Sequence, residues 1–346
     1  MTPTLTRTMA ASAAVLVIAA LAGCSQAENT GGTGTEADQP PNATDAFPVT
    51  IEHAFGEVTI PAQPENVVVV GLTEQDILLE LGVTPVATTE WYGEQPYATW
   101  PWATELLGDA QPEVLSTTDG FEYGKIAALR PDLIVGMNAG IDQDAYDKLS
   151  SIAPTIAHLE GAEAYFSDWQ DQTRTIATAL GMTQEGEALV ASVEDAYAEV
   201  AAAHPQWEGM TATFAQGDVS SGTVWAYPDG LNTDFLTDLG FTITPGLEEH
   251  APDGYQAQIS AENLDLLEAD VVVFTTDYEG ALEDLLDFGT MSTLPAVAEN
   301  RAVYTDPVLA GAIYFLTPLS QKYVLTELIP RLELAAEGQA PRDMLG

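Results

Sequence analysis

Two stretches of sequence decide the fold: KIAALRPDLIV at residues 125–135 and NLDLLEADVVV at residues 263–273. Each pattern predicts a short helix, a tight turn at Asp132 or Asp270, and a strand. An apolar run without alternation is typical of a strand that is buried on both faces of a sheet. The two aspartates coincide when the stretches are aligned, which favours an internal repeat, although common helix-turn-strand units produce the same match without duplication.

Strands and helices alternate around the first stretch. In order, we predict a hairpin at 49–60, a strand at 67–70, a helix at 77–81, a strand from 85–87, a helix at 146–152 and a last strand at 155–157. Strands that are separated by helices of this length predict a parallel α/β sheet.

The alternation resumes around the second stretch, after Pro205. We predict strands at 212–215, 224–227, 271–275 and 302–304, with helices at 232–239, 261–267, 281–286 and 318–336. Between the halves lie a helix at 168–180 and a longer one at 184–204, which carries Val190, Val193 and Val200 on one face. At 1.5 Å per residue the longer helix spans roughly 30 Å. The sequence therefore predicts two Rossmann-like α/β lobes, at 47–183 and 205–346, joined by one bridging helix; the alternative is an ordinary helix packed on one sheet.

The first 46 residues differ from the rest in composition. Arg7 precedes an apolar run at residues 9–22, and the string Leu-Ala-Gly-Cys ends at Cys24, which is the only cysteine. The positive start, the length of the apolar run and its small-residue ending predict a secretory signal peptide at 1–23. The run is shorter than the roughly 20 residues that span a bilayer, which argues against a permanent transmembrane helix. The string resembles the bacterial lipobox, which implies that a lipid on Cys24 anchors the chain to the extracytoplasmic face of the cell membrane. Residues 24–46 are then the anchor and a flexible leash; the alternative is a soluble secreted chain with an incidental cysteine.

Charge, histidine spacing and one incomplete motif argue against several classes of function. The chain has 53 acidic and 9 basic residues and a net charge of −44, which disfavours nucleic acids and anionic lipid surfaces as partners. The four histidines, at 53, 158, 204 and 250, show no metal-ligand spacing. Asp218 stands where a nucleophile elbow around Ser220 would need glycine. We therefore predict no enzyme activity, no metal site and no cofactor.

Aromatic residues are concentrated at residues 91–102. This segment holds Trp91, Tyr92, Tyr97, Trp100 and Trp102 together with two prolines. Flat apolar rings on a constrained loop favour ligand binding, although the same rings also suit the edge of a core. In the second half, Trp225 and Tyr227 are candidates for which core packing is the alternative, and Tyr278, Tyr304 and Tyr314 are weaker candidates.

The motifs resemble those of the class III solute-binding proteins of ATP-driven importers. The resemblance rests on NVVVVG at 66–71, LLELGVTPV at 78–86, IAALRPDLI at 126–134, and ISAE at 259–262 leading to ADVVV at 269–273. The segment WYGEQPY at 91–97 is most similar to the iron-siderophore branch. The resemblance implies a monomer that captures a ferric siderophore in a cleft between the lobes and delivers it to an ABC permease and its ATPase. Haem or cobalamin binding within the same family, or a secreted lipoprotein hydrolase, are the alternatives.

The resemblance also implies one permease-docking glutamate on each lobe. Glu262 matches the second-lobe position, where a helix dipole is the alternative explanation for a carboxylate. The first-lobe position falls on Gly124, which leaves Glu122 as a substitute. The candidate pocket segments contain no Lys or Arg. A highly anionic chelate needs several converging cations, so we predict a neutral or cationic ligand of the ferric hydroxamate type.

Overall fold

A computed structural model describes residues 46–165, 167–219, 221–252 and 254–344. The predicted signal peptide, the lipidation site Cys24 and the leash up to residue 45 lie outside the described residues. Within those four ranges no helix combines the length and the hydropathy needed to cross a membrane.

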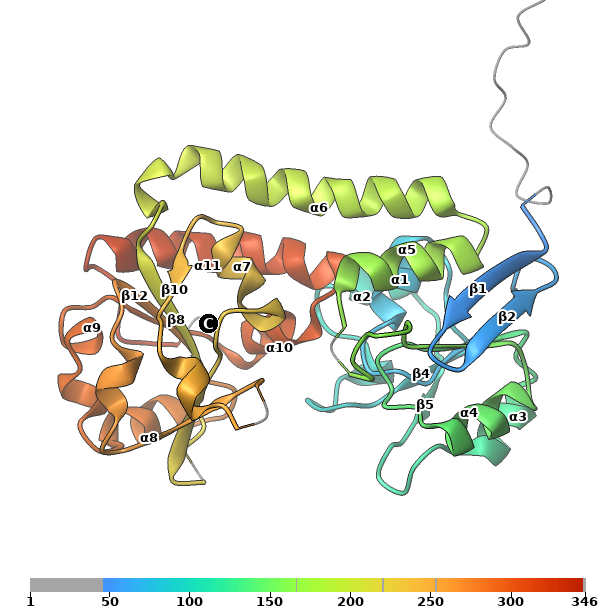
Figure 1. Cartoon of the computed structure of the whole chain (residues 1–346), viewed down its shortest axis with the longest axis horizontal. Coiled ribbons are helices and arrows are strands. Elements are labelled where there is room, and N and C mark those ends of the chain that lie inside the picture. The colour runs from blue at the N-terminus through green and yellow to red at the C-terminus, as the bar shows by residue number, and fades with distance from the viewer. Residues whose placement is uncertain (1–45, 166, 220, 253, 345–346) are drawn as a thin grey trace, which may run out of the picture. The chain divides into compact units, whose positions relative to one another are not determined.

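Strands and helices alternate along the described chain (Figure 1). The strands are β1 (Val49–His53), β2 (Gly56–Ile60), β3 (Val67–Val69), β4 (Ala87–Thr89), β5 (Glu113–Leu115), β6 (Leu133–Gly136), β7 (Thr155–Ala157), β8 (Thr211–Gln216), β9 (Thr223–Ala226), β10 (Thr242–Ile243), β11 (Ala257–Ser260), β12 (Val271–Thr275) and β13 (Ala302–Tyr304). The helices are α1 (Gln75–Glu80), α2 (Thr104–Leu107), α3 (Tyr123–Leu129), α4 (Gln143–Ser150), α5 (Trp169–Ala179), α6 (Thr183–Ala203), α7 (Asp234–Thr237), α8 (Ala281–Asp287), α9 (Pro295–Ala298), α10 (Pro307–Phe315) and α11 (Pro318–Ala336).

The N-terminal half forms a parallel sheet with strand order β5–β4–β3–β6–β7. In β3, Val67 and Val69 pack in one apolar cluster and Val68 packs in another, because successive side chains point to opposite faces. Helices α1 and α5 contribute to the first cluster, and α3 and α4 contribute to the second. This arrangement confirms the prediction of strands buried on both faces.

The C-terminal half forms a mixed sheet with strand order β11–β9–β8–β12–β13, and β10 pairs with β8. Strands β8, β10, β12 and β13 are parallel, whereas β9 is antiparallel to both β8 and β11. The chain between Gln216 and Thr223 is too short for a helical crossover, so β9 must return antiparallel. The helix predicted at 261–267 is wrong in type and extent, since only a 3-10 turn, η6 (Leu264–Leu267), forms there.

In the sequence, helix α6 follows the strands of the first sheet and precedes those of the second. It packs on helices from both halves. It contacts α5 of the first half and α11 of the second (Figure 1). Val190, Val193 and Tyr197 on α6 enter an apolar cluster that covers one face of the second sheet. The fold prediction of two α/β lobes and a bridging helix is confirmed, while the predicted lobe boundaries stay a prediction.

The two aspartates of the repeated stretches make equivalent contacts. The carboxylate of Asp132 accepts hydrogen bonds from the backbone N–H groups of Glu65 and Asn66, each at 2.9 Å, just before β3. The carboxylate of Asp270 accepts one from the N–H of Thr211, at 2.8 Å, at the start of β8. Each aspartate therefore fixes the start of the neighbouring parallel strand, which is a physical reason for the match between the stretches.

Candidate functional site

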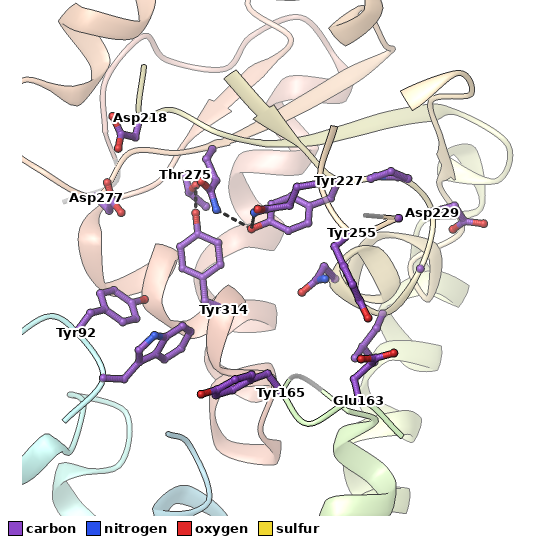
Figure 2. A pocket seen from close by; sticks show the side chains of 18 of the residues that line it. Tyr92, Glu163, Tyr165, Asp218, Tyr227, Asp229, Tyr255, Thr275, Asp277 and Tyr314 are labelled. Atoms are coloured by element: carbon purple, nitrogen blue, oxygen red, sulfur yellow. Dashed lines mark hydrogen bonds between the residues drawn. The ribbon is translucent and has the colours of Figure 1, made fainter. Parts of the chain in front are cut away.

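A cavity of about 800 Å³ lies where strands of both sheets end (Figure 2). From the first half, Trp91 and Tyr92 follow β4, and residues 163–165 follow β7. From the second half, Gln216 and Thr275 end β8 and β12, and Tyr314 comes from α10. The carboxyl ends of parallel strands are where open α/β sheets bind ligands. The position and size of this cavity make it the candidate ligand site.

Three tyrosines with buried hydroxyl groups, Tyr92, Tyr227 and Tyr314, line the cavity. Figure 2 shows Tyr227 and Tyr314 near each other, with Tyr92 reaching in from the N-terminal half. The Tyr314 hydroxyl is hydrogen-bonded to the Thr275 hydroxyl, whereas the Tyr92 hydroxyl is buried without a hydrogen-bond partner among the described residues. Burial raises the pKa of Tyr227 to about 12, and it also raises the pKa values of Tyr92 and Tyr314 above the ordinary value of a tyrosine. All three hydroxyls therefore keep their protons at neutral pH.

The cavity is electronegative. Its described lining includes four carboxylates and contains no Lys, Arg or His; the carboxylates are Glu163, Asp218, Asp229 and Asp277. The pKa of Asp277 is raised, first by burial and then by the nearby Asp218. In the part of the chain that the structure describes, no group of three or more His, Cys, Asp or Glu residues is placed to hold a metal ion. The walls therefore suit a neutral or cationic molecule better than an anionic one.

Six of the nine Lys and Arg residues of the chain form ion pairs elsewhere. The pairs are Lys125–Glu113, Lys148–Asp144, Arg174–Glu187, Arg301–Glu268, Lys322–Glu80 and Arg331–Asp343. Each of these partners lies outside the cavity lining. The sequence prediction that the pocket segments lack cations therefore holds for the described lining.

The seven aromatic residues predicted for ligand binding divide into two groups. Trp91, Tyr92 and Tyr227 line the cavity. Tyr97, Trp100, Trp102 and Trp225 do not. Of the three weaker candidates, Tyr314 lines the cavity, while Tyr304 stacks on Phe274 in the core and Tyr278 donates to Asp284.

Trp100 and Trp102 form a stacked pair behind Tyr92. Their ring centroids are 5.1 Å apart, and Trp100 is only 3% exposed. A Cβ atom at Gly311 of α10 would lie 2.6 Å from the Trp100 ring, so only glycine lets α10 approach so closely. Phe315 of α10 contacts both tryptophans. The pair thus supports the cavity wall from the core, which is the alternative that the sequence left open.

A buried carboxyl group fixes this aromatic pair. Asp76 of α1 accepts hydrogen bonds at Oδ2 from Trp102 Nε1 and from Thr317 Oγ1, both at 2.7 Å. Thr317 is the N-cap of α11, so this one oxygen joins α1, the aromatic segment and the C-terminal half. One turn later on α1, Glu80 pairs with Lys322 of α11 at 2.5 Å.

Several lining residues were missed from the sequence. They include residues 163–165, Gln216, Asp218, Tyr255, Gln256 and Asp277. Part of this set could have been predicted from its position at the ends of the strands predicted at 212–215 and 271–275. The residues at these strand ends are Gln216, Asp218, Thr275 and Asp277. The loops that carry residues 163–165 and Tyr255 show no periodicity, so no pattern marked them.

The two predicted docking glutamates differ in their surroundings. Glu122 precedes α3, and its Oε2 accepts a hydrogen bond from the Ser116 N–H at 2.9 Å and lies 3.7 Å from Lys125 Nζ. Glu262 is exposed and makes no hydrogen bond or ion pair with any described residue. No α-helix begins at Glu262, so the helix-dipole explanation for this carboxylate is wrong.

This chain is similar to known proteins in both sequence and fold. The profile of a family described as periplasmic binding protein matches residues 67–309. A periplasmic solute binding protein from Mycobacterium smegmatis is 42% identical, with a TM-score of 0.77 over 83% of this chain and 98% of that one. PiaA from Streptococcus pneumoniae, an iron uptake ABC transporter substrate-binding protein solved in complex with ferrichrome, is 25% identical, with a TM-score of 0.71 over 84% of this chain and 99% of that one.

A curated relative gives a shorter match. The probable siderophore-binding lipoprotein YfiY of Bacillus subtilis (strain 168) is 33% identical over 150 residues, which is 42% of this chain. The matched stretch also spans 42% of that relative, which is less than half of its length.

Proposed function

The chain belongs to the periplasmic binding protein family, and we propose that it captures a ferric siderophore outside the cytoplasmic membrane and delivers it to an ABC permease for iron uptake. Support comes from PiaA, solved with ferrichrome, and from YfiY, named as a siderophore-binding lipoprotein. These relatives favour a ferric siderophore over haem or cobalamin. They are named as binding proteins, so the chain is a binding protein and not an enzyme, and the hydrolase alternative has no support.

The observation that carries the proposal is the cavity at the strand ends of both sheets. Its volume of about 800 Å³ falls within the roughly 300–1,000 Å³ of small-molecule sites. Aromatic rings and tyrosine hydroxyls offer apolar faces and hydrogen bonds to the exterior of a chelate. The four carboxylates, without a cation in the described lining, favour a neutral or cationic chelate of the hydroxamate type over an anionic catecholate.

Calorimetric titration of the purified mature chain tests this function. The probes are ferrichrome, which is neutral, ferrioxamine B, which is cationic, and ferric enterobactin, which carries three negative charges. We expect saturable binding of one or both hydroxamates and no binding of the catecholate. Tight binding of ferric enterobactin without hydroxamate binding would refute the ligand class, and no binding of any ferric chelate would refute the function itself.

The membrane anchor is a second part of the proposal. The lipobox-like string ending at Cys24 supports lipidation, and YfiY is named as a lipoprotein. We expect the wild-type chain in the membrane fraction of its host, labelled by radioactive palmitate. Replacement Cys24→Ala abolishes the label and releases the chain, and an unchanged membrane fraction of this variant would contradict lipid anchoring.

Docking to the permease is the third part, and the chain acts in it as a monomer. The exposed, unpaired Glu262 supports a contact with a cationic surface of the permease. We expect Glu262→Arg to reduce uptake of radiolabelled ferric chelate while leaving chelate affinity unchanged. Glu122→Arg has a smaller effect, because the Glu122 carboxylate already binds the Ser116 N–H. Normal uptake by the double variant would exclude docking through these two residues.

A further inference from the structure

The hydroxyl of Tyr227 lies between two side-chain amides at the inner end of the cavity. Gln216 Nε2 donates to the hydroxyl oxygen at 2.7 Å, and Gln256 Nε2 donates to it at 2.8 Å. A tyrosine hydroxyl has one hydrogen to donate and can accept two hydrogen bonds. Both accepting positions of the oxygen are therefore filled, and its hydrogen is committed to neither amide.

The Tyr227 hydroxyl makes no other hydrogen bond with the residues that the structure describes. The hydroxyl of Tyr314, which Figure 2 shows beside Tyr227, is hydrogen-bonded to the Thr275 hydroxyl. Tyr227 itself lines the cavity, so the remaining direction for its hydrogen is the cavity interior. A protonated hydroxyl so placed is satisfied when a bound molecule presents an acceptor.

We propose that the Tyr227 hydroxyl is a fixed hydrogen-bond donor to the ligand, held in that role by Gln216 and Gln256 as positioning residues. The inference rests on the proposed function and narrows its ligand: the face of the chelate that enters the second half of the site carries an unprotonated oxygen, such as a hydroxamate or amide carbonyl oxygen. A chelate that presents an N–H or O–H group at this point leaves two donors facing each other.

The surroundings hold the donor in place. The Tyr227 ring stacks on Phe214 with centroids 4.7 Å apart and an interplanar angle of 16°, and the residue is 5% exposed. Gln216 ends β8, and Gln256 immediately precedes β11, so both amides sit on strand ends. Strands β8 and β11 both flank β9, whose last residue precedes Tyr227. A donor fixed by packing and by supporting hydrogen bonds loses little conformational freedom when the ligand binds.

Two conservative variants separate the roles of these residues. Tyr227→Phe removes the donor and keeps the ring, so we expect affinity for ferrichrome to fall about tenfold, as for one well-formed hydrogen bond. Gln256→Glu keeps the shape but replaces the amide donor by a carboxylate, which accepts the Tyr227 hydrogen and turns it away from the ligand. We expect a similar loss for this variant.

A double-mutant cycle distinguishes a positioning role of Gln256 from a purely structural one, because only in a positioning role does the effect of Gln256→Glu on affinity depend on the Tyr227 hydroxyl. In the Tyr227→Phe background there is no hydrogen to redirect, so adding Gln256→Glu lowers affinity by less than twofold further. This background also measures the effect of the added charge alone. Tyr304→Phe is the matched control, because Tyr304 is a buried core tyrosine outside the cavity, and its affinity stays at the wild-type value.

The outcomes distinguish this inference from the proposed function. If the wild-type chain binds none of the ferric chelates, the proposed function fails. If it binds ferrichrome and both single variants bind within twofold of wild type, the function stands and the donor role is overturned. Equal, additive losses in the cycle overturn the positioning role of Gln256. If Gln256→Glu does not fold, the Tyr227→Phe measurement decides the donor role alone.

Discussion

Asp76 is a buried carboxyl group at a contact between the two halves of the chain. It is 0% exposed, and its Oδ1 has no hydrogen-bond partner within the described ranges, although Oδ2 accepts two. Burial, with a smaller contribution from nearby Glu80, raises the pKa of Asp76 to about 7, against the hydrogen bonds from Trp102 and Thr317, which lower it. The charge on this contact between the two halves therefore changes near neutral pH.

The sign of the resulting pH dependence follows from linkage. The folded chain binds this proton more tightly than the unfolded chain, whose aspartate has a pKa near 3.8. Below about pH 4 the group is neutral in both states, and the cost of burying the carboxylate grows between about pH 4 and pH 7. We predict that Asp76→Asn, which keeps an acceptor for Trp102 and Thr317, gains stability relative to wild type across this interval, by up to about 4 kcal/mol.

Urea unfolding of both proteins at a series of pH values measures this difference. Subtracting the two curves removes the shared effect of the other carboxylates. Asp76→Ala is the control, since it leaves Trp102 Nε1 and Thr317 Oγ1 without an acceptor and is less stable than Asp76→Asn at every pH. A constant difference between Asp76→Asn and wild type from pH 4 to pH 7 would show that Asp76 titrates normally.

At the scale of single residues, the sequence predicted part of the site. The density of aromatic residues marked Trp91 and Tyr92, which line the cavity, but it marked Trp100 and Trp102 equally, which do not. Composition cannot tell which side of a loop a ring faces, and here the approach of α10 at Gly311 decides it. The strand predicted at 212–215 placed Gln216 at a strand end, but no pattern showed that Gln216 and Gln256 meet at Tyr227, because that contact depends on pairing between strands far apart in sequence.

At the scale of elements, the long helices and the apolar buried strands were predictable, whereas a helix that is apolar on all sides was not. Helix α6 was expected at 184–204 and spans Thr183–Ala203, and α11 was expected with the bounds that it has. Helix α10, with the sequence PVLAGAIYF, was missed because it is apolar on all sides and shows no helical period. The antiparallel course of β9 depends on the short connection from β8, which a pattern of alternating elements does not reveal.

The packing of α6 on α5 gives a prediction for one glycine. A Cβ atom at Gly186 would lie 2.4 Å from the Cβ of Ala177 on α5. Alanine normally stabilises a helix interior relative to glycine by up to about 1 kcal/mol. At this position the overlap forces the helices apart, so we predict that Gly186→Ala lowers the free energy of unfolding by about 1–3 kcal/mol.

Gly124 of α3 is the matched control for Gly186. It is also a helical glycine, but a Cβ atom there meets nothing within 4 Å. We therefore expect Gly124→Ala to leave stability unchanged or to raise it by up to about 1 kcal/mol. Thermal unfolding of both variants is the measurement, and a gain in stability for Gly186→Ala would contradict the close approach of α5 and α6.

At the scale of the whole molecule, the charge imbalance sets the ionic conditions for folding. The net charge is −44, and most of the few cations are already held in ion pairs. Unbalanced carboxylates repel one another more in the folded chain than in the expanded unfolded chain. Salt shortens the range of this repulsion to about 10 Å at 0.1 M. We predict that the thermal midpoint rises by several degrees from 0.01 to 0.5 M NaCl.

Replacing two exposed acidic residues on α6 distinguishes the screening of charge repulsion from other effects of salt on stability. Asp195 and Glu199 lie one helical turn apart, and like charges at this spacing destabilise a helix by about 0.2–0.5 kcal/mol. The double variant Asp195→Asn/Glu199→Gln should therefore be more stable than wild type at 0.01 M NaCl and equal to it at 0.5 M. Glu187→Gln on the same helix loses the ion pair with Arg174 and gains nothing at low salt. The double variant and Glu187→Gln are each compared with wild type at both salt concentrations. If neither difference in stability depends on salt, repulsion among the acidic residues does not limit the stability of this fold.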